Sequence, residues 1–211
     1  MIKEVCVENF EEAIKAQKMG ASRIELCENL HVGGTTPSYG TIALCKKYLK
    51  IPFFVMIRPR GGNFVYNDIE VEIMKKDIKL CRELGVEGIV FGVLNQKAEI
   101  NTQVVQELCV LARGMSITFH KAIDECPRPD LAIKHIKMIG SIDRVLTSGG
   151  KPTAIEGMEM LKKMRDAARQ DPVIIVAGKV TKDNIDEIKE MIPAKEFHGR
   201  RLVGDLTQEE S

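Results

Sequence analysis

The stretch that decides the fold is Phe53-Phe54-Val55-Met56-Ile57-Arg58-Pro59-Arg60-Gly61-Gly62. Its first five residues are all apolar, which is typical of a strand covered on both faces. Pro59 then restrains the backbone, so that the strand ends stiffly. Because side chains alternate along an extended chain, Arg58 and Arg60 share one side. We expect their guanidinium groups to hold a carboxylate or phosphate at the strand's carboxyl end; two solvated loop arginines are the alternative.

Short apolar runs alternate with helical patterns along the whole chain. The expected strands are Lys3–Cys6, Arg23–Cys27, Phe53–Arg58, Gly88–Phe91, Ser116–His120, Asp143–Thr147, Val173–Val176 and Lys195–His198. Helices are expected over 9–19, from Thr36-Pro37, over 69–84 and 101–113, over 129–139 and 154–168, and from a cap at Thr181 to 191. Eight such units predict an α/β fold, a TIM (β/α)8 barrel, with an open doubly wound sheet as the competitor.

The absence of a linker or a shift in composition indicates one domain over residues 1–211. Residues 199–211 form a short, largely polar tail after the last strand, so the eighth helix is expected to be missing or shortened. This would leave an apolar groove between the seventh and first helices. Such a groove on a barrel invites a partner, and we therefore predict a homodimer through that face.

Composition excludes several classes of protein. The 31 basic residues nearly balance the 30 acidic ones, which argues against nucleic-acid and membrane-surface binding. No apolar run approaches the roughly 20 residues of a membrane span, and the first residues do not form a signal peptide, so a cytoplasmic protein is predicted. The six cysteines include no Cys-x-x-Cys pair and are expected to be free thiols.

Polar residues gather where the expected strands end, which in a barrel is the face that carries chemistry. One interpretation is a layer of satisfied ion pairs, such as Glu25 with Arg58; the other is a pocket for a ligand. In the second, the candidate general acids or bases are Glu25, His120 and His198. The candidate anion-binding residues are Arg58, Arg60, Thr147, Ser148, Gly149, Gly150 and Lys179. The Ser148-Gly149-Gly150 turn resembles a phosphate cradle, but a plain tight turn is an equal alternative.

Cys6 and Cys27 end the first two expected strands, at equivalent positions of successive units. If the strand ends lie side by side, both sulfurs can reach one ion, and two soft thiolates suit Cu(I). The alternative is that they are small packing residues. His31 and His135 are expected to be solvated, as is the Arg200-Arg201 pair.

Segments from the whole chain resemble the copper homeostasis protein CutC family. They are Glu4-Val5-Cys6-Val7, Arg23-Ile24-Glu25-Leu26-Cys27, Gly33-Gly34-Thr35-Thr36-Pro37-Ser38, Val55-Met56-Ile57-Arg58-Pro59-Arg60-Gly61-Gly62, Gly88-Ile89-Val90-Phe91-Gly92, Thr118-Phe119-His120-Lys121-Ala122, Arg144-Val145-Leu146-Thr147-Ser148-Gly149-Gly150 and Glu196-Phe197-His198. The resemblance implies a cytoplasmic TIM barrel with a role in copper tolerance. It also implies Cu(I) ligands at Cys6 and Cys27. After the seventh strand the chain reads Ala177-Gly178-Lys179 where the family carries a run of glycines.

Two functions of different classes follow. The first is a copper homeostasis protein that binds Cu(I) through Cys6 and Cys27, with His120 or His198 as further donors. The second is a TIM-barrel enzyme acting on a small anionic substrate, with Arg58 and Arg60 as the clamp. A barrel that serves only as an interaction surface is a weaker third.

Overall fold

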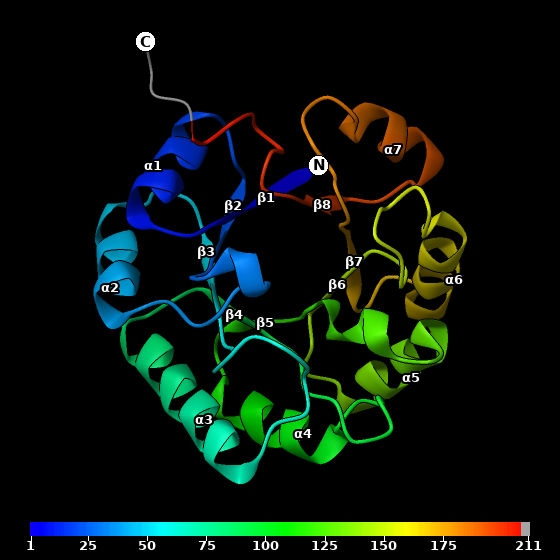
Figure 1. Ribbon diagram of the computed structural model, residues 1–211, viewed down its shortest axis with the longest axis horizontal. Coiled ribbons are helices and arrows are strands. Elements are labelled where there is room, and N and C mark those ends of the chain that lie inside the picture. The colour runs from blue at the N-terminus through cyan, green and yellow to red at the C-terminus, as the bar shows by residue number, and fades with distance from the viewer. Residues whose placement is uncertain (208–211) are drawn as a thin grey trace.

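The computed structural model describes residues 1–207 and confirms a closed barrel of eight parallel strands in sequential order. In Figure 1 the helices surround the strands as an outer ring. The strands are β1 (Ile2–Val7), β2 (Arg23–Leu26), β3 (Phe53–Met56), β4 (Gly88–Phe91), β5 (Ser116–Phe119), β6 (Arg144–Thr147), β7 (Val173–Val176) and β8 (Glu196–His198). β8 pairs with β1 and closes the barrel.

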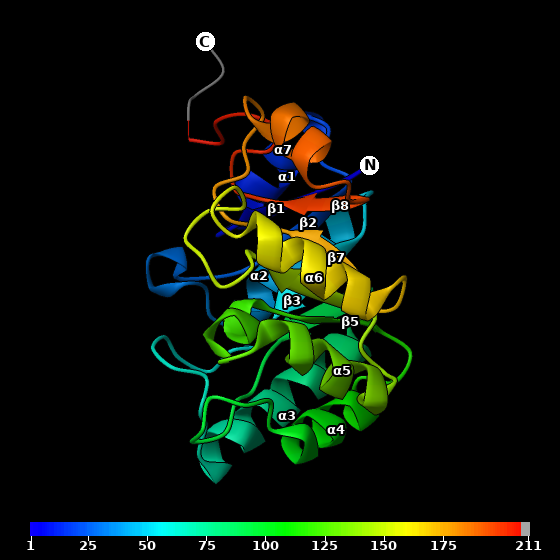
Figure 2. The same cartoon turned by 90° about the vertical axis from the view of Figure 1, so that its right-hand side faces the viewer.

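Seven α-helices of the described residues pack outside the strands, and Figure 2 shows α5 and α6 in front of the sheet on one side. They are α1 (Phe10–Lys18), α2 (Tyr39–Tyr48), α3 (Asp68–Glu83), α4 (Thr102–Leu111), α5 (Pro129–Ile139), α6 (Met158–Ala168) and α7 (Ile185–Met191). Short 3-10 turns, η1 (Leu30–Val32) and η2 (Lys121–Glu125), follow β2 and β5. No helix in residues 1–207 is long and apolar enough to cross a membrane.

Local sequence signals account for most helix boundaries. Asn67 and Glu70 form a capping box at the start of α3, and Asn101 caps α4 by accepting from a backbone N–H. Pro129 occupies the first turn of α5, and Gly140 ends that helix with φ 70°, a conformation that glycine adopts without strain.

Two expected caps are wrong. The hydroxyl of Ser38, not that of Thr36, accepts from the first turn of α2, while Thr36 Oγ1 accepts from the backbone N–H of Arg58 at 2.9 Å. Thr181 lies before α7, in a parallel bridge with Arg201. The Thr36 hydroxyl and the Thr181 backbone thus each join two loops instead of capping a helix.

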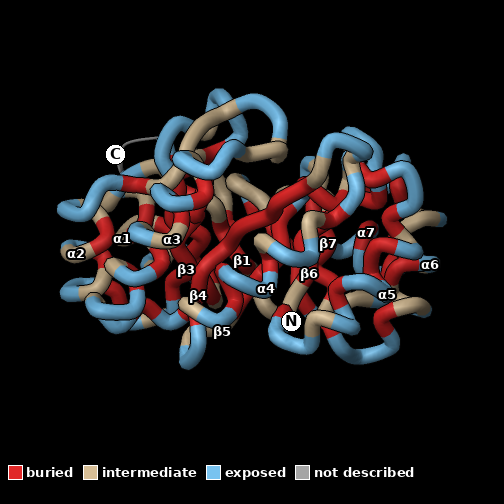
Figure 3. The backbone as a smooth tube through the Cα atoms, turned by 90° about the horizontal axis from the view of Figure 1, so that it is seen from below, coloured by how far each residue is buried: buried red, intermediate tan, exposed pale blue. Residues whose placement is uncertain are grey.

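The barrel wall separates two buried regions, which Figure 3 shows in red between the helices and at the centre. Side chains that point outward from the strands form the main apolar core beneath the helices. Inside the barrel, two small apolar clusters lie apart from it, one around Phe54, Met56 and Val90 and one around Leu146 and Ile175. The rest of the interior is polar.

The chain after β8 fills the place of an eighth helix. Leu202, Val203 and Leu206 are buried in the main core, and Figure 1 shows this red segment crossing from β8 toward α1 between α1 and α7. The backbone N–H of Lys182 donates to the carbonyl of Arg201, which fixes the segment beside α7. No helix follows β8 within residues 1–207, as expected, but the described tail covers the groove that was expected to be open. The homodimer therefore stays a prediction without that groove as its reason.

We expect Leu202→Ala to lower the free energy of unfolding by about 3 kcal/mol, because a fully buried leucine leaves a cavity when it is shortened. Urea denaturation followed by circular dichroism measures this change. Val110 is 63% exposed, so Val110→Ala is the matched control and should change the free energy of unfolding little. A decrease in the free energy of unfolding below about 1 kcal/mol for Leu202→Ala would show that the segment after β8 does not pack in the main core.

Candidate functional site at the carboxyl end of the barrel

A layer of ion pairs lies inside the barrel at the level of the first residues of β8. The Arg23 guanidinium donates to both Glu4 and Glu196, all three side chains being buried. Arg144 Nε lies 3.4 Å from Glu196 Oε2, within ion-pair range but without a hydrogen bond. Both guanidinium groups stack on the ring of Phe54, at 4.8 and 5.1 Å. An ion-pair layer thus exists, with partners other than the expected Glu25 and Arg58.

Glu25 belongs to a second group, one level closer to the mouth. Ligand atoms of Cys6, Glu25 and His198 all lie within 4.8 Å of one another. Glu25 Oε2 is 3.7 Å from His198 Nε2 and accepts a hydrogen bond from Cys27 Sγ at 3.5 Å. This carboxyl group therefore faces the histidine and the thiols.

The register of β1 and β2 separates the two cysteines. Cys6 pairs with Glu25, so Cys27 lies two residues further along the neighbouring strand. The expectation that the two cysteines end their strands level with each other is wrong, because the strands are staggered. Cys27 packs with Phe54 and Met56, as the packing alternative expects, and its sulfur still touches Glu25.

Glu4 orients the ring of His198. The two residues share a hydrogen bond of 2.9 Å between Glu4 Oε1 and His198 Nδ1. Burial opposes ionisation of Glu4, but His198 and Arg23 outweigh it and lower its pKa to about 2. An ionised carboxylate only accepts, so Nδ1 carries the proton and Nε2 points at Glu25 and Cys6.

The pKa values of His198 and Glu25 are both shifted in this buried group. Burial disfavours the charged imidazole of His198, but Glu25, Cys6 and Glu4 reverse that effect and raise its pKa well above 6.5. Burial is also the main reason why the pKa of Glu25 is raised. The site therefore tends to hold protons, which any metal ion that binds there would have to displace.

The six cysteines are all free, and five of them are buried. Burial, followed by Glu25, raises the pKa of Cys27 well above 9. Burial likewise raises the pKa of Cys45, Cys81 and Cys109 to about 12 and that of Cys126 to about 11. Cys6 alone is half-buried, which makes it the accessible thiol.

His120 lies in a different group from His198. Its Nδ1 accepts from the backbone N–H of Ala122 at 3.2 Å and so caps η2. Its ring packs on Phe64, with centroids 4.8 Å apart, and against Gly92, where a Cβ would come within 2.5 Å of the imidazole. Burial and the charge of Arg58 lower the pKa of His120 to about 3. The imidazole is therefore neutral, and its Nε2 has no hydrogen-bond partner among the described residues.

Arg58 uses its guanidinium on the protein's own loops. It donates to the carbonyl oxygens of Val32 and Gly34 at 2.9 Å and of Gly62 at 2.6 Å, and stacks on Phe64 at 4.8 Å. Three of the five N–H donors of this guanidinium group are in use, and Arg58 is 4% exposed, so little of it is available to an anion.

Arg60 is engaged in the same way. It forms a two-pronged pair with Glu70 and donates to the carbonyl oxygens of Gly61, Asn63 and Val65. The two arginines thus anchor separate loop segments. An anion held between them would have to displace these contacts, and the clamp remains an untested prediction that the geometry does not favour.

The expected phosphate cradle already holds an anion, the carboxylate of Asp124. The backbone N–H groups of Ser148 and Gly150 donate to it at 3.0 and 2.9 Å, and Lys121 Nζ lies 2.9 Å away. Thr147 also donates to Asp124 at 2.5 Å and Ser148 Oγ donates at 3.0 Å. The amide of Gly149 donates to Thr147 Oγ1 at 2.9 Å.

Thr147 does not face the barrel interior as expected. Its hydroxyl also lies 3.7 Å from the sulfur of Met164 on α6, which places the side chain on the outer face of the sheet. By strand alternation the next residue, Ser148, is the inward one. This turn is therefore an internally satisfied connection in the described structure.

A cavity of about 590 Å³ opens at the mouth beside the metal-ligand group. It is lined by Cys6, Lys121, Pro152, Ala177, Gly178, Lys179, Val180, Thr181, His198, Gly199, Arg200 and Arg201. Among the expected anion-binding residues, only Lys179 lines it.

Three cations at this cavity were missed by the sequence analysis, although a signal for one was present. Arg200 lies two residues after His198, and strand alternation places both on one side. Arg200 is not the solvated residue expected: it pairs with Glu8 at 2.8 Å and with Glu12 at 2.9 Å. Lys121 and Arg201 lie in loops, where no periodicity indicates direction.

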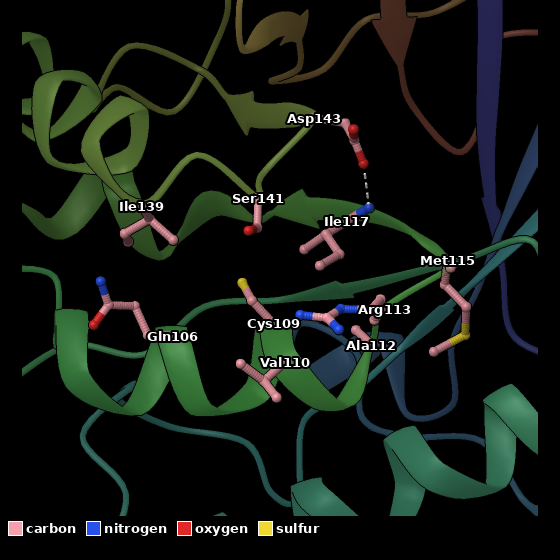
Figure 4. Close-up of a pocket in the computed structure, with 11 residues that line it drawn as sticks. Gln106, Cys109, Val110, Ala112, Arg113, Met115, Ile117, Ile139, Ser141 and Asp143 are labelled. Atoms are coloured by element: carbon pink, nitrogen blue, oxygen red, sulfur yellow. Dashed lines mark hydrogen bonds between the residues drawn. The ribbon is translucent and has the colours of Figure 1, made fainter.

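A second cavity, of about 450 Å³, lies at the opposite end of the barrel, between α4 and the start of β5 (Figure 4). Its acidic group, Asp143, accepts from the backbone N–H of Ile117 at 2.7 Å, and the thiol of Cys109 has its pKa raised to about 12 by burial. With both groups serving structure, this cavity offers no competing chemical site.

We expect His120→Asn to reduce the loss of stability in acid. The pKa of His120 is about 3 in the folded protein and near 6.5 in the unfolded chain. Between these values the unfolded chain binds one more proton, so the free energy of unfolding decreases as the pH is lowered. At pH 5 this costs about 2 kcal/mol. Asparagine can still accept from the Ala122 N–H and does not titrate.

Urea denaturation at pH 7 and pH 5 tests this. The wild type should lose about 2 kcal/mol more than His120→Asn between the two values. His198 is present in both proteins, so its opposite contribution cancels. An equal loss in the two proteins would contradict a neutral, buried His120.

Comparisons with known proteins agree with the fold. The CutC family model matches residues 1–202. Over 195 residues, 92% of this chain, the sequence is 44% identical to the mouse copper homeostasis protein cutC homolog and 42% identical to the human one, covering 71% of each. It is 41% identical over 196 residues to a CutC family protein of Bacteroides fragilis, covering 78% of that protein.

Solved structures give the same result. The crystal structure of CutC from Streptococcus agalactiae superposes with a TM-score of 0.91 at 37% identity, covering 96% of this chain and 99% of that one. A Rubisco-like protein from Rhodopseudomonas palustris, at 12% identity and a TM-score of 0.67 over 96% of this chain and 60% of that one, shares the fold alone. On the match of the family model and of these relatives, the chain belongs to the CutC family.

Proposed function

We propose that this chain acts in copper homeostasis by binding Cu(I) between Cys6 and His198 in the cytoplasm. The observation that carries the proposal is the cluster of sulfur, carboxyl oxygen and imidazole nitrogen within 4.8 Å, inside an otherwise closed barrel. The names of the mouse and human relatives, copper homeostasis protein cutC homologs, support the choice of metal.

The donor atoms fit Cu(I). Thiolate and imidazole are ligands that this ion accepts, and a carboxylate suits harder cations better. Two donors on opposite sides of an ion lie about 4.3 Å apart, if bonds are like those of zinc to sulfur and nitrogen. The Cys6 and His198 atoms lie within 4.8 Å of each other, so the fit needs only a small adjustment.

Glu4 would be the outer partner of the metal-binding histidine. Its bond to Nδ1 leaves Nε2 for the ion and fixes the plane of the ring, as carboxylate–histidine–metal arrangements do. Because the pKa of His198 is raised, binding would release a proton from Nε2.

Cys27 enters the proposal as a third donor. Its sulfur lies 3.5 Å from Glu25 Oε2, the oxygen that is also 3.7 Å from His198 Nε2. The raised pKa of Cys27 keeps its thiol protonated until a metal ion displaces the proton. A reducing cytoplasm would keep both thiols available.

The cavity at the mouth gives the ion a route, since both Cys6 and His198 line it. The enzyme alternative loses support because Arg58 and Arg60, its intended clamp, hold loop carbonyls and Glu70. We therefore carry forward the metal-binding function.

We predict that Cys6→Ser and His198→Asn each weaken Cu(I) binding by at least about a hundredfold, as loss of a ligand exceeds the 10–100-fold effect of losing an outer partner. Asparagine at 198 keeps a donor for Glu4 and removes only the metal-binding nitrogen. Glu4→Gln should weaken binding by about 10–100-fold. Competition with a Cu(I)-specific chelator measures each dissociation constant.

The cysteine controls separate the possible ligand sets. Cys45→Ser, at a buried thiol of the outer core, should leave the affinity unchanged. An effect of Cys27→Ser smaller than that of Cys6→Ser supports the Cys6–His198 pair, whereas equal effects would restore the two-thiolate site. Wild-type affinity in the Cys6→Ser, Cys27→Ser double variant would end the proposal.

A further inference from the structure

The cavity at the mouth carries more positive charge than the protein neutralises. Four cationic side chains line it, and no aspartate or glutamate does: Lys121, Lys179, Arg200 and Arg201. Lys121 pairs with Asp124, and Arg200 pairs with Glu8 and Glu12.

The remaining two cations have no carboxylate partner within ion-pair distance, although the charge of Arg201 contributes to lowering the pKa of Asp205. Within residues 1–207, neither Lys179 nor Arg201 forms an ion pair with a carboxylate, and both are exposed. They come from the loops that follow β7 and β8, which the Thr181–Arg201 bridge joins. Two unpaired charges on tied loops at one cavity offer a site for a doubly charged anion.

The backbone at Lys179 is a second, independent indication. Lys179 has φ 55°, in the left-handed region that a glycine occupies more easily, and it directly follows Gly178 with φ 100°. Backbone strain of this kind persists where surrounding structure enforces it and is concentrated at functional sites. A lysine there costs stability that a glycine would not, which supports a role for its charge.

The loop that carries Lys179 is held firmly. The carbonyl of Gly178 accepts from the backbone N–H of Ala154 at 2.9 Å, and that of Lys179 accepts from Asn184 Nδ2 at 3.0 Å. A Cβ on Gly178 would come within 2.8 Å of Ser148 Cβ, so this loop packs tightly on the one after β6. The backbone that carries the Lys179 ammonium group is thus held in place before any ligand binds.

We propose that Lys179 and Arg201 form the phosphate-binding end of a site for a small organic phosphomonoester. A phosphomonoester carries a charge near −2 at neutral pH, which matches the two unpaired cations. The cavity volume of about 590 Å³ lies in the range for small-molecule sites, and Pro152, Ala177 and Val180 supply apolar wall for the organic part. Loops after strands seven and eight commonly bind phosphate in this fold.

This site is separate from the proposed copper ligands in its residues, though the same cavity reaches both. Cys6 and His198 line the cavity from β1 and β8, and Lys179 and Arg201 line it from the loops after β7 and β8. The organic phosphate would therefore sit over the metal-ligand group. Anion binding does not depend on the copper proposal and can be measured on metal-free, reduced protein.

The test uses glycerol 3-phosphate and inorganic phosphate as probes, by calorimetric titration of the full chain against chloride at matched ionic strength. We expect saturable binding of both, tighter for the ester. The double variant Lys179→Gln, Arg201→Gln should weaken binding of both probes by at least about tenfold, because it loses hydrogen bonds from two charged groups. Lys189→Gln with Arg113→Gln removes the same charge from exposed residues outside the cavity and should change nothing.

A further variant guards against misfolding. Lys179→Gly should raise the melting temperature, because the left-handed position suits glycine, while it weakens phosphate binding. Cys6→Ser should retain phosphate binding, which separates this site from the copper site. The proposal is overturned by no saturable binding of either probe at millimolar concentration, or by equal binding in the cavity and control double variants. Equal affinity for ester and inorganic phosphate would overturn the organic part of the assignment.

Discussion

The interior of the barrel depends on one buried carboxylate, that of Glu4. It is fully buried, and an unpaired charge there would cost several kcal/mol. Arg23 and His198 supply the compensating partners, and their bonds to Glu4 join β1 to β2 and to β8, where the barrel closes. The need to satisfy one charge therefore fixes both the closure of the sheet and the orientation of the histidine in the candidate metal site.

Other charged groups at the mouth also have partners within the protein. Several residues that were expected to bind a ligand therefore bind the protein's own loops. Arg58 meets loop carbonyls, and Asp124 fills the turn that resembles a phosphate cradle. A buried polar group without a partner is costly, so loops arrange themselves around such groups. Of the four Lys and Arg side chains that line the mouth cavity, Lys179 and Arg201 form no ion pair with a carboxylate within residues 1–207.

The barrel was predictable because each strand and helix carries its own local pattern. The inward direction of Glu25 and Cys27 also follows from alternation. The pairing of Cys6 with Glu25 does not, because the stagger between parallel strands is set by closure of the whole barrel and leaves no mark on either segment. Asp124 was equally hidden, since its contacts with Ser148 join residues 24 positions apart through two loops.

The polarity of the mouth follows from how its two sides are built. On the β1–β2 side, the carboxyl groups of Glu4 and Glu25 are buried beside the thiols, and burial raises the pKa values of Glu25 and Cys27. On the β7–β8 side, the cations lie on short loops open to solvent. A soft cation is thus favoured at depth and an anion at the rim. A cation bound at depth and an anion bound at the rim would attract each other, so binding of either ion would raise the affinity of the other site.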